Sequence, residues 1–326
     1  MGTKRNLISI QSACWYDDSN PGKSISFIKS CGFEAIDFDL AEYFKKTFDE
    51  KTLTSAYDRG IDAVVDHYRP LKKALQENGV KISMSHAPYP IYFPDNKEKS
   101  SYLISVVEKM IAVCAFLGCP AIVVHANYSN DGEDLKKEQE IIINNFTWFI
   151  PAAKKYGVTV CLENAMRAFN GYIYEGTCTD AAEACYYVDT LNDIAGEKLF
   201  GFCFDTGHAL AASRDLYRYV TTLGSRLINI HIHENNGTKD SHLIPYTQKD
   251  SSGYQPVADW DRFLKGLKQI GYSGPINFET FLGYKSFPED VRPAVFRLLC
   301  DIGKYFRRGR SKTKIATALN FAQKVI

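Results

Sequence analysis

Short apolar runs alternate along the chain with longer segments of helical periodicity, and this alternation predicts repeated strand–helix units. The apolar runs, rich in β-branched and aromatic residues, predict strands over 6–12, 33–40, 81–86, 119–125, 157–163, 199–205, 226–233 and 275–279. Apolar residues that recur every three or four positions predict helices over 22–31, 55–78, 97–117, 133–155, 179–192, 209–223, 258–270 and 289–305. Strands and helices that alternate in this number close a barrel of parallel strands.

The predicted fold class is therefore α/β, a (β/α)8 TIM barrel that forms a single domain. The barrel is expected over residues 1–305, and residues 306–326 form a basic C-terminal helical extension. A doubly wound open sheet is the structural alternative, but no glycine-rich phosphate loop follows the first strand. Six Lys or Arg residues lie between Lys304 and Lys314. We interpret the extension as a solvated capping helix, with a phosphate-binding or subunit-contacting role as the alternative.

Two connecting segments, 41–54 and 234–257, are longer than common loops and are expected to lie over the barrel mouth. The formal net charge of +1 gives no global field that would favour a nucleic acid or a membrane surface. The first residues lack the apolar stretch of a secretory signal, and we expect a cytoplasmic protein with no membrane contact. Nine cysteines without a C-x-x-C motif favour free thiols over a disulfide framework or a zinc knuckle.

Metal-capable side chains stand at the ends of four predicted strands: Glu163, Asp205, His231 and Glu279. The carboxyl ends of barrel strands meet at one mouth, so these four residues are expected to lie together. Three carboxylates brought together repel and desolvate one another, and a divalent cation removes that cost. Three oxygen ligands and one imidazole suit Mn²⁺, Mg²⁺ or Co²⁺, with Zn²⁺ still open.

Five further residues with the same chemistry surround this group of four: His86, His125, His208, Asp240 and His242. Six of the seven histidines lie in the strand-end and loop segments, and only His67 is on a predicted helix face. His233 should share a strand face with His231, and we expect it to pack against or orient a ligand. The predicted site is therefore assembled from the whole chain.

Several motifs resemble the xylose isomerase-like TIM barrels, the sugar phosphate isomerase/epimerase and endonuclease IV superfamily. The matching segments are CLEN, FDTGH, NIHIHEN, and DSHL followed by ADWDRFLKGLKQIGYSGPINFE. The resemblance covers nearly the whole chain up to about residue 305 and is most specific between Asp205 and Glu279. It implies a single catalytic metal on Glu163, Asp205, His231 and Glu279, as in the ketose epimerases and inositol-type isomerases.

The same superfamily contains apurinic endonucleases with three zinc ions. Their pattern would make His86, His125, His208, Asp240 and His242 additional zinc ligands. Sugar-active members use such groups to hold substrate hydroxyls. The predicted mouth segments carry few Lys or Arg residues and several aromatic ones, Tyr89 among them, which favours a small sugar over a phosphodiester backbone. Unlike the similar ketose 3-epimerases, this chain has no arginine shortly after its metal-binding histidine, so Arg167 is the candidate cation, unless it only pairs with a rim acid.

The leading hypothesis is a divalent-metal-dependent isomerase or epimerase acting on a sugar or keto-polyol, through proton abstraction next to a carbonyl and a metal-bound enediolate. Mn²⁺ is the first choice of metal. Glu163 and Glu279 would exchange the proton, and His125 and His208 would orient hydroxyls or relay protons. His86, Tyr89, Arg167, Asp240 and His242 would bind the substrate.

Two alternatives stay open. One is a lyase of the same fold that acts on oxidised sugars, either a dehydratase or a C-glycoside deglycosidase subunit. The other is the three-zinc apurinic endonuclease. The expected partners are a small sugar or glycoside and further copies of the chain, with a second, different subunit in the lyase case and no nucleic acid in the leading hypothesis.

Overall fold

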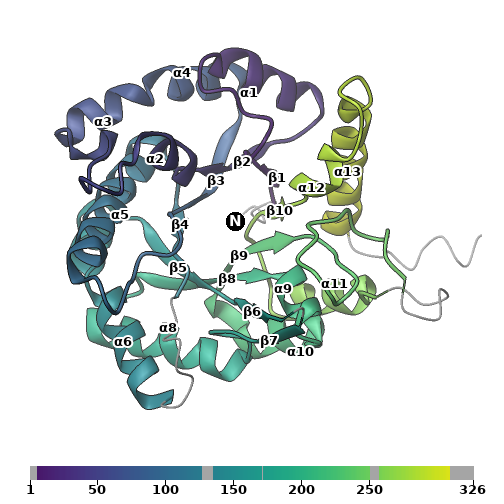
Figure 1. Ribbon diagram of the computed structural model, residues 1–326. Coiled ribbons are helices and arrows are strands. Elements are labelled where there is room, and N and C mark those ends of the chain that lie inside the picture. The colour runs from purple at the N-terminus through teal and green to yellow at the C-terminus, as the bar shows by residue number, and fades with distance from the viewer. Residues whose placement is uncertain (1–5, 127–134, 171, 250–256, 309–326) are drawn as a thin grey trace, which may run out of the picture.

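Eight parallel strands close into a barrel at the centre of the protein (Figure 1). The computed structural model describes residues 6–126, 135–170, 172–249 and 257–308. The barrel strands are β1 (Ile8–Gln11), β2 (Ala35–Asp39), β3 (Lys81–His86), β4 (Ala121–Val123), β5 (Thr159–Glu163), β8 (Phe200–Asp205), β9 (Leu227–Ile232) and β10 (Ile276–Phe278). Their order around the barrel is β1-β10-β9-β8-β5-β4-β3-β2. Each strand lies inside a predicted range, so the predicted TIM barrel is confirmed.

Helices follow the strands and form a ring around the barrel (Figure 1). The long ones are α1 (Pro21–Ser30), α4 (Arg69–Asn78), α5 (Lys97–Leu117), α6 (Leu135–Thr147), α8 (Ala181–Ala195), α10 (Leu216–Leu223), α11 (Trp260–Gln269) and α13 (Arg292–Arg308). Their ends follow from local chemistry. In α5, the Asn96 side chain accepts a hydrogen bond from the Lys99 N–H, and Gly118 ends the helix with a φ of 72° that glycine adopts without strain.

Three of the predicted helices are interrupted in the structure. The range 55–78 divides into the 3₁₀-helix η1 (Ala56–Asp58), α3 (Ile61–His67) and α4, whose first turn contains Pro70. The range 133–155 divides between α6 and α7 (Ile150–Tyr156), and Pro151 stands in the first turn of α7. Proline lacks the N–H that would continue a preceding helix, so a new helix starts at each of these positions.

The third interruption falls in the range 209–223, which contains the end of α9 (Thr206–Ala211) and α10. The Asp205 side chain accepts from the His208 N–H and starts α9 directly after β8. The chain then breaks at Ser213, where φ is 58°, and Asp215 caps α10. The helix therefore begins earlier than predicted, because the last residue of the strand is itself an N-cap.

Two predicted loop regions contain structure of their own. Helix α2 (Ala41–Thr47) lies in the predicted loop 41–54, and α12 (Phe281–Lys285) follows β10. An antiparallel hairpin of β6 (Met166–Phe169) and β7 (Tyr172–Glu175) follows β5. The sequence Asn170-Gly171 between two alternating runs is a hairpin signal that the strand prediction passed over.

Helix α5 is the one described helix with the length and composition of a membrane span. Val106, Val107, Met110 and Ile111 on this helix are fully buried in the main hydrophobic cluster, so in this fold it serves as a core helix. Most of the predicted extension 306–326 and part of the loop 234–257 lie outside the described residues, and the boundary at residue 305 stays a prediction.

Candidate active site

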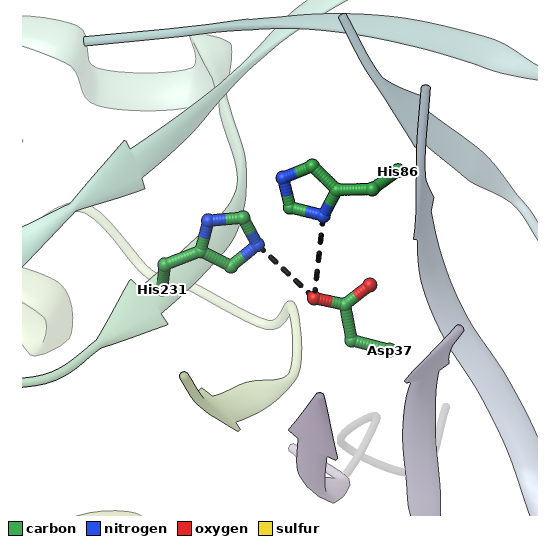
Figure 2. A group of neighbouring side chains, drawn as sticks. All are labelled: Asp37, His86 and His231. Atoms are coloured by element: carbon green, nitrogen blue, oxygen red, sulfur yellow. Dashed lines mark ion pairs between the residues drawn. The ribbon is translucent and has the colours of Figure 1, made fainter. Parts of the chain in front are cut away.

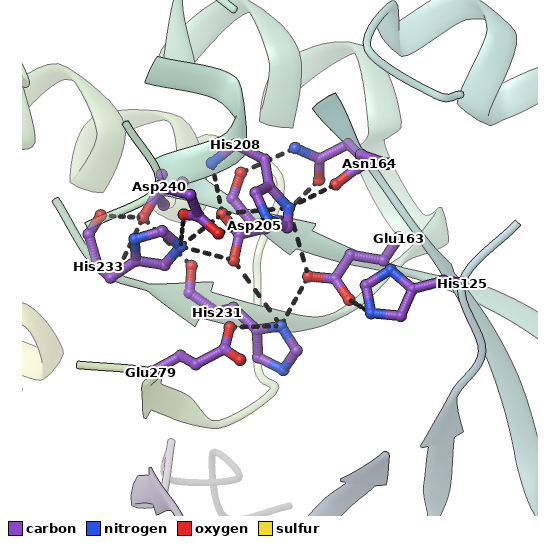
Figure 3. Close-up of polar contacts among 12 residues, drawn as sticks. His125, Glu163, Asn164, Asp205, His208, His231, His233, Asp240 and Glu279 are labelled. Carbon is purple, nitrogen blue, oxygen red and sulfur yellow. Dashed lines mark hydrogen bonds and ion pairs between the residues drawn. The ribbon is translucent and has the colours of Figure 1, made fainter. Parts of the chain in front are cut away.

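The predicted site residues gather at the carboxyl ends of the barrel strands (Figure 3). Glu163 and Asp205 are the last residues of β5 and β8, and His86 is the last residue of β3. His231 lies one residue before the end of β9, and Glu279 follows β10 directly. All five side chains are buried. The barrel thus brings together residues that are far apart in the sequence.

Three carboxylates face one nitrogen of His231. Its Nδ1 lies 2.8 Å from Glu163 Oε1, 3.4 Å from Glu279 Oε2 and 4.0 Å from Asp205 Oδ2. The three carboxylates come from β5, the end of β10 and β8, so they approach from different strands of the barrel wall. We call Glu163, Asp205, His231 and Glu279 the core group.

The electrostatics of the core group fit a divalent cation. Burial disfavours the charged form of His231, but Cys203 and the carboxylates of Glu163 and Glu279 outweigh it and hold its pKa well above the usual range. Burial acts in the opposite direction on Glu163, yet the surrounding imidazoles keep its pKa well below the usual value. Glu163 Oε2 is buried and has no hydrogen-bond partner among the described residues. A bound cation would give this oxygen a partner and offset the repulsion between the carboxylates.

Two histidines from early strands converge on that same oxygen. Nε2 of His86 lies 3.5 Å and Nε2 of His125 lies 3.4 Å from Glu163 Oε2, and we call these residues the early histidine pair. Burial lowers the pKa of His125 to about 4, because the neighbouring imidazoles add to desolvation and Glu163 only partly opposes it. Burial also disfavours charged His86, but its contacts with Asp37 and Glu163 raise its pKa to about 10. The pair therefore contains one neutral imidazole and one that readily holds a charge.

A late histidine cluster of His208, Asp240 and His242 lies on the other side of the core group. His208 Nδ1 lies 2.8 Å from the main-chain oxygen of Asn164, and His242 Nδ1 lies 2.9 Å from that of Glu279. A carbonyl oxygen only accepts, so both Nδ1 atoms are donors. The Nε2 atoms then face Asp240 Oδ2, at 3.5 Å from His208 and 3.0 Å from His242.

The charges within the late histidine cluster reinforce one another. Burial opposes ionisation of all three groups, but the imidazoles keep the pKa of Asp240 far below its usual range. Asp205 and Asp240 together hold the pKa of His208 well above the usual value, and Asp240 with Glu279 raises the pKa of His242 to about 9. The loop that carries Asp240 and His242 is closed by paired main-chain hydrogen bonds between Glu234 and Leu243.

The imidazole of His233 contacts the carboxylate of Asp205. Its Nε2 lies 2.9 Å from Asp205 Oδ1, and its ring stacks on that of His242 with centroids 4.0 Å apart. A Cβ on Gly207 would come within 1.8 Å of the His233 ring, so glycine is needed to admit the ring at this point. The contact matches the expected packing and orienting role.

Two predicted substrate-binding residues lie toward the rim. Arg167 on β6 forms an ion pair with Glu138 of α6, with 3.2 Å between its Nη2 and Oε1. The ion-pair alternative for Arg167 is thus present in the structure. The ring of Tyr89 lies 5.2 Å from that of His125, and the side chain is half exposed. A substrate contact for either residue stays a prediction.

A family model for xylose isomerase-like TIM barrels matches residues 25–298. This chain belongs to the xylose isomerase-like TIM barrel family. The fold is therefore a family feature, and the expected superfamily is confirmed.

The proteins related to this chain in sequence are named for different activities. A probable endonuclease 4 of Methanocorpusculum labreanum is 29% identical over 52% of this chain and 62% of its own. An inosose isomerase of Bacillus velezensis is 24% identical over 67% of this chain and 75% of its own. The chain spans only 52% to 63% of the length of the first curated relatives that it matches.

Among solved structures, the 3-keto-D-glucoside 4-epimerase of E. coli superposes with a TM-score of 0.66. It is 16% identical, and the match covers 92% of this chain and 99% of the epimerase. At this level of identity the likeness establishes the shared barrel, and the chemistry has to be argued from the site.

The structure adds polar residues that the sequence analysis did not select. Gln11, at the end of β1, donates from Nε2 to Glu279 Oε1 at 2.6 Å. Asn164 donates to the main-chain oxygen of Asp205 and accepts from its N–H, both at 2.8 Å. Asp37 in β2 is fully buried and contacts two histidines of the site. The run AIDFD, with acids at alternate positions of an apolar strand, was the available signal for Asp37.

Proposed function

We propose that this protein is a divalent-metal-dependent isomerase or epimerase of a sugar or keto-polyol. The observation that carries the proposal is the convergence of three carboxylates, from β5, β8 and β10, on Nδ1 of His231. The core group would hold the metal, with Mn²⁺ as the first choice and Mg²⁺, Co²⁺ or Zn²⁺ as alternatives.

When bound, the metal would polarise the substrate carbonyl and so acidify the adjacent C–H. Glu163 and Glu279 reach the core from separate strands, which suits one as the base and the other as the acid. The base takes the proton from carbon, the C–H electron pair moves toward the carbonyl oxygen to give an enediolate, and a carboxyl returns a proton. The Gln11 hydrogen bond holds Oε1 of Glu279, while Oε2 faces the centre of the site.

The flanking groups would hold the substrate hydroxyls. His125 is neutral at pH 7, because its pKa is about 4, so its imidazole can accept a hydrogen bond from a hydroxyl. His208 has its Nδ1–H fixed on the Asn164 carbonyl, which leaves Nε2 for a hydroxyl or for Asp240. His86, Asp240, His242 and Tyr89 line the same mouth and are proposed substrate contacts.

The names of the relatives support this class of reaction. The B. velezensis relative is named an inosose isomerase, and the E. coli protein with the same barrel is a 3-keto-D-glucoside 4-epimerase. A homo-oligomer in the cytoplasm is the expected form of the enzyme, and a second, different subunit is expected only if the reaction is an elimination.

The test is exchange of the carbon-bound proton in D₂O. Protein stripped of metal and then reloaded with Mn²⁺ should incorporate deuterium next to the carbonyl of a keto-sugar and give the epimer or isomer. Equal rates without metal would contradict the mechanism. Loss of water or of an aglycone from a keto-glycoside would replace it with the lyase.

The three-zinc apurinic endonuclease stays the second candidate on a specific observation. The early histidine pair converges on Glu163 Oε2, and His208 and His242 converge on Asp240 Oδ2. The early group of His86, His125 and Glu163 could hold one further metal, and His208, Asp240 and His242 offer the same types of ligand for a second. A relative named as a probable endonuclease 4 is in keeping with this reading.

Charge at the rim weighs against the endonuclease. Arg167 and Arg214, beside the mouth, form ion pairs with Glu138 and Glu175, and a phosphate backbone would have to compete with these carboxylates. Elemental analysis separates the two candidates. One metal per chain and no nicking of abasic DNA would remove the endonuclease, whereas three zinc ions with nicking would establish it.

A further inference from the structure

Asp37 lies beneath the core group and has no role in the proposed reaction so far. It belongs to β2, its side chain is fully buried, and it points toward His86 and His231 (Figure 2). Its Oδ2 lies 3.2 Å from Nε2 of His231 and 3.7 Å from Nδ1 of His86. The Asn277 side chain donates to the same oxygen at 3.2 Å. A single carboxylate oxygen thus faces two imidazoles.

The two imidazoles span the space between Asp37 and Glu163. His231 has Nε2 toward Asp37 and Nδ1 toward Glu163 Oε1, whereas His86 has Nδ1 toward Asp37 and Nε2 toward Glu163 Oε2. The rings are stacked, with centroids 4.7 Å apart and planes inclined by 20°. Each ring therefore has one nitrogen facing the core site and one facing Asp37.

The surroundings of His231 Nε2 show that this nitrogen carries a hydrogen. Besides Asp37 Oδ2, the sulfur of Met84 lies 3.0 Å from Nε2. Carboxylate oxygen and thioether sulfur are both acceptors, so an N–H is needed at Nε2. Nδ1 also faces a carboxylate, Glu163 Oε1 at 2.8 Å, so both nitrogens carry hydrogen while no metal is bound. A metal at Nδ1 would displace the hydrogen there, and the N–H at Nε2 would remain on Asp37.

We propose that Asp37 is a positioning residue that accepts the Nε2–H of His231 and attracts the Nδ1–H of His86 from 3.7 Å, and thereby directs Nδ1 of His231 and Nε2 of His86 to the metal and substrate. The inference rests on the proposed function, because it assigns the orientation of that same site. The Asn277 amide donates to the same Oδ2, which shows independently that this oxygen serves as an acceptor.

The presence of a carboxylate at this buried position has a physical reason. A buried ion pair is seldom more stabilising than apolar residues of the same size, so its presence in a barrel interior calls for another benefit. A carboxylate behind a ligating histidine fixes its tautomer and ring orientation and increases its basicity. Asp37 would do this for His231 at 3.2 Å and, by charge across 3.7 Å, for His86.

The first experiment compares Asp37→Asn with Asp39→Asn by calorimetric titration of Mn²⁺ into metal-free protein. Asp39 is a matched control, because it is a partly buried acid of the same strand, and its carboxylate accepts from the Ala41 N–H. Asp37→Asn should bind Mn²⁺ about 10-fold to 100-fold more weakly than the wild type, and Asp39→Asn should bind like the wild type. Equal affinity of Asp37→Asn and wild type would overturn the Asp37 proposal alone, while a wild type that binds no Mn²⁺ would overturn the proposed function.

The second experiment needs no variant. In wild-type protein with ¹⁵N-labelled histidine and bound Zn²⁺, which is diamagnetic, NMR should find hydrogen on Nε2 of His231 and on Nδ1 of His86. Hydrogen on Nδ1 of His231 would overturn the proposal. This result stands even if Asp37→Asn fails to fold.

Discussion

The early histidine pair and the late histidine cluster flank the same core group, but they depend on different carboxylates. His86 and His125 converge on Glu163, whose other oxygen contacts His231. His208 and His242 converge on Asp240, which comes from the loop after β9. A change at Glu163 therefore disturbs the core and the early pair together, whereas a change at Asp240 acts mainly on the late cluster.

The two groups also differ in charge. Burial and neighbouring imidazoles lower the pKa of His125 to about 4, whereas Asp240 and Glu279 outweigh burial and raise the pKa of His242 to about 9. At neutral pH the early pair offers a neutral imidazole that can take a proton, and the late cluster is a set of paired charges. We therefore expect the early histidine pair to take part in proton transfer, and the late histidine cluster to bind the substrate or a separate metal.

The largest expected effect is the difference in kcat/KM between the variants Glu163→Gln and Asp240→Asn. Glu163→Gln should lower kcat/KM by about 10³-fold or more, because it removes both a metal ligand and a proton-transfer group. Asp240→Asn should cost about 10-fold to 100-fold, because its histidines keep their main-chain partners. Steady-state rates on a keto-sugar, with Mn²⁺ in excess, provide the measurement. Equal losses in the two variants would show that both groups carry the chemistry.

Metal removal should destabilise the protein next most strongly. A metal at 100 times its dissociation constant adds about 2.7 kcal/mol to the free energy of unfolding. For a chain of this size that amounts to several degrees in Tm, at about 2–4 °C per kcal/mol. Thermal unfolding with and without Mn²⁺ measures the gain. Asp240→Asn should keep the full gain if the core alone binds metal, and a clear loss of the gain in this variant would point to metal in the late cluster.

Substitution of His125 tests whether the early histidine pair contains a neutral imidazole that takes part in the reaction. His125→Gln should lower kcat by about tenfold, because the amide cannot relay a proton. In the wild type, His125 should contribute no loss of activity until the pH falls toward 4, where its imidazole becomes protonated. The pH profiles of both proteins test this expectation. If the wild-type activity falls below about pH 6.5 and the variant shows no such fall, His125 has an ordinary pKa.

The smallest effect concerns protons released on metal binding. His231 holds a proton well above the usual pH range because its pKa is raised, and a metal at Nδ1 must displace that proton. Metal affinity should therefore rise with pH, by about tenfold per unit for each proton released. Calorimetry in buffers of different ionisation enthalpy counts the protons. About one proton indicates the core alone, and additional protons from His208 and His242 would indicate metal in the late cluster.

The strand ranges and the core group could be predicted from the sequence for simple reasons. Strands of this barrel are short apolar runs, and the polar residue that ends each run is visible in the sequence. Because parallel strands bring their carboxyl ends to one mouth, Glu163, Asp205, His231 and Glu279 had to converge. The interrupted helices were also signalled, by Pro70 and Pro151, but helical periodicity continues across both positions and concealed the breaks.

Asp37 and Gln11 were harder to find, because a polar residue within or at the end of a buried strand has no partner until the barrel closes. Asp37 meets His231, 194 residues further along the chain by number, only through the closed order of strands. Arg167 illustrates the opposite case. The sequence analysis selected it as a candidate substrate-binding cation, and in the fold it forms an ion pair with the buried carboxylate of Glu138.

By itself the sequence determined the barrel, the end of the barrel that carries the site and the residue types that meet there. Those features follow from hydrophobic periodicity and from the geometry of parallel strands, which are local in the chain. Only the tertiary structure decided which nitrogen of each histidine faces which carboxylate, and hence that His125 is neutral while His242 is charged. Ring orientation and pKa depend on burial and on neighbours from distant strands, and no local pattern encodes them.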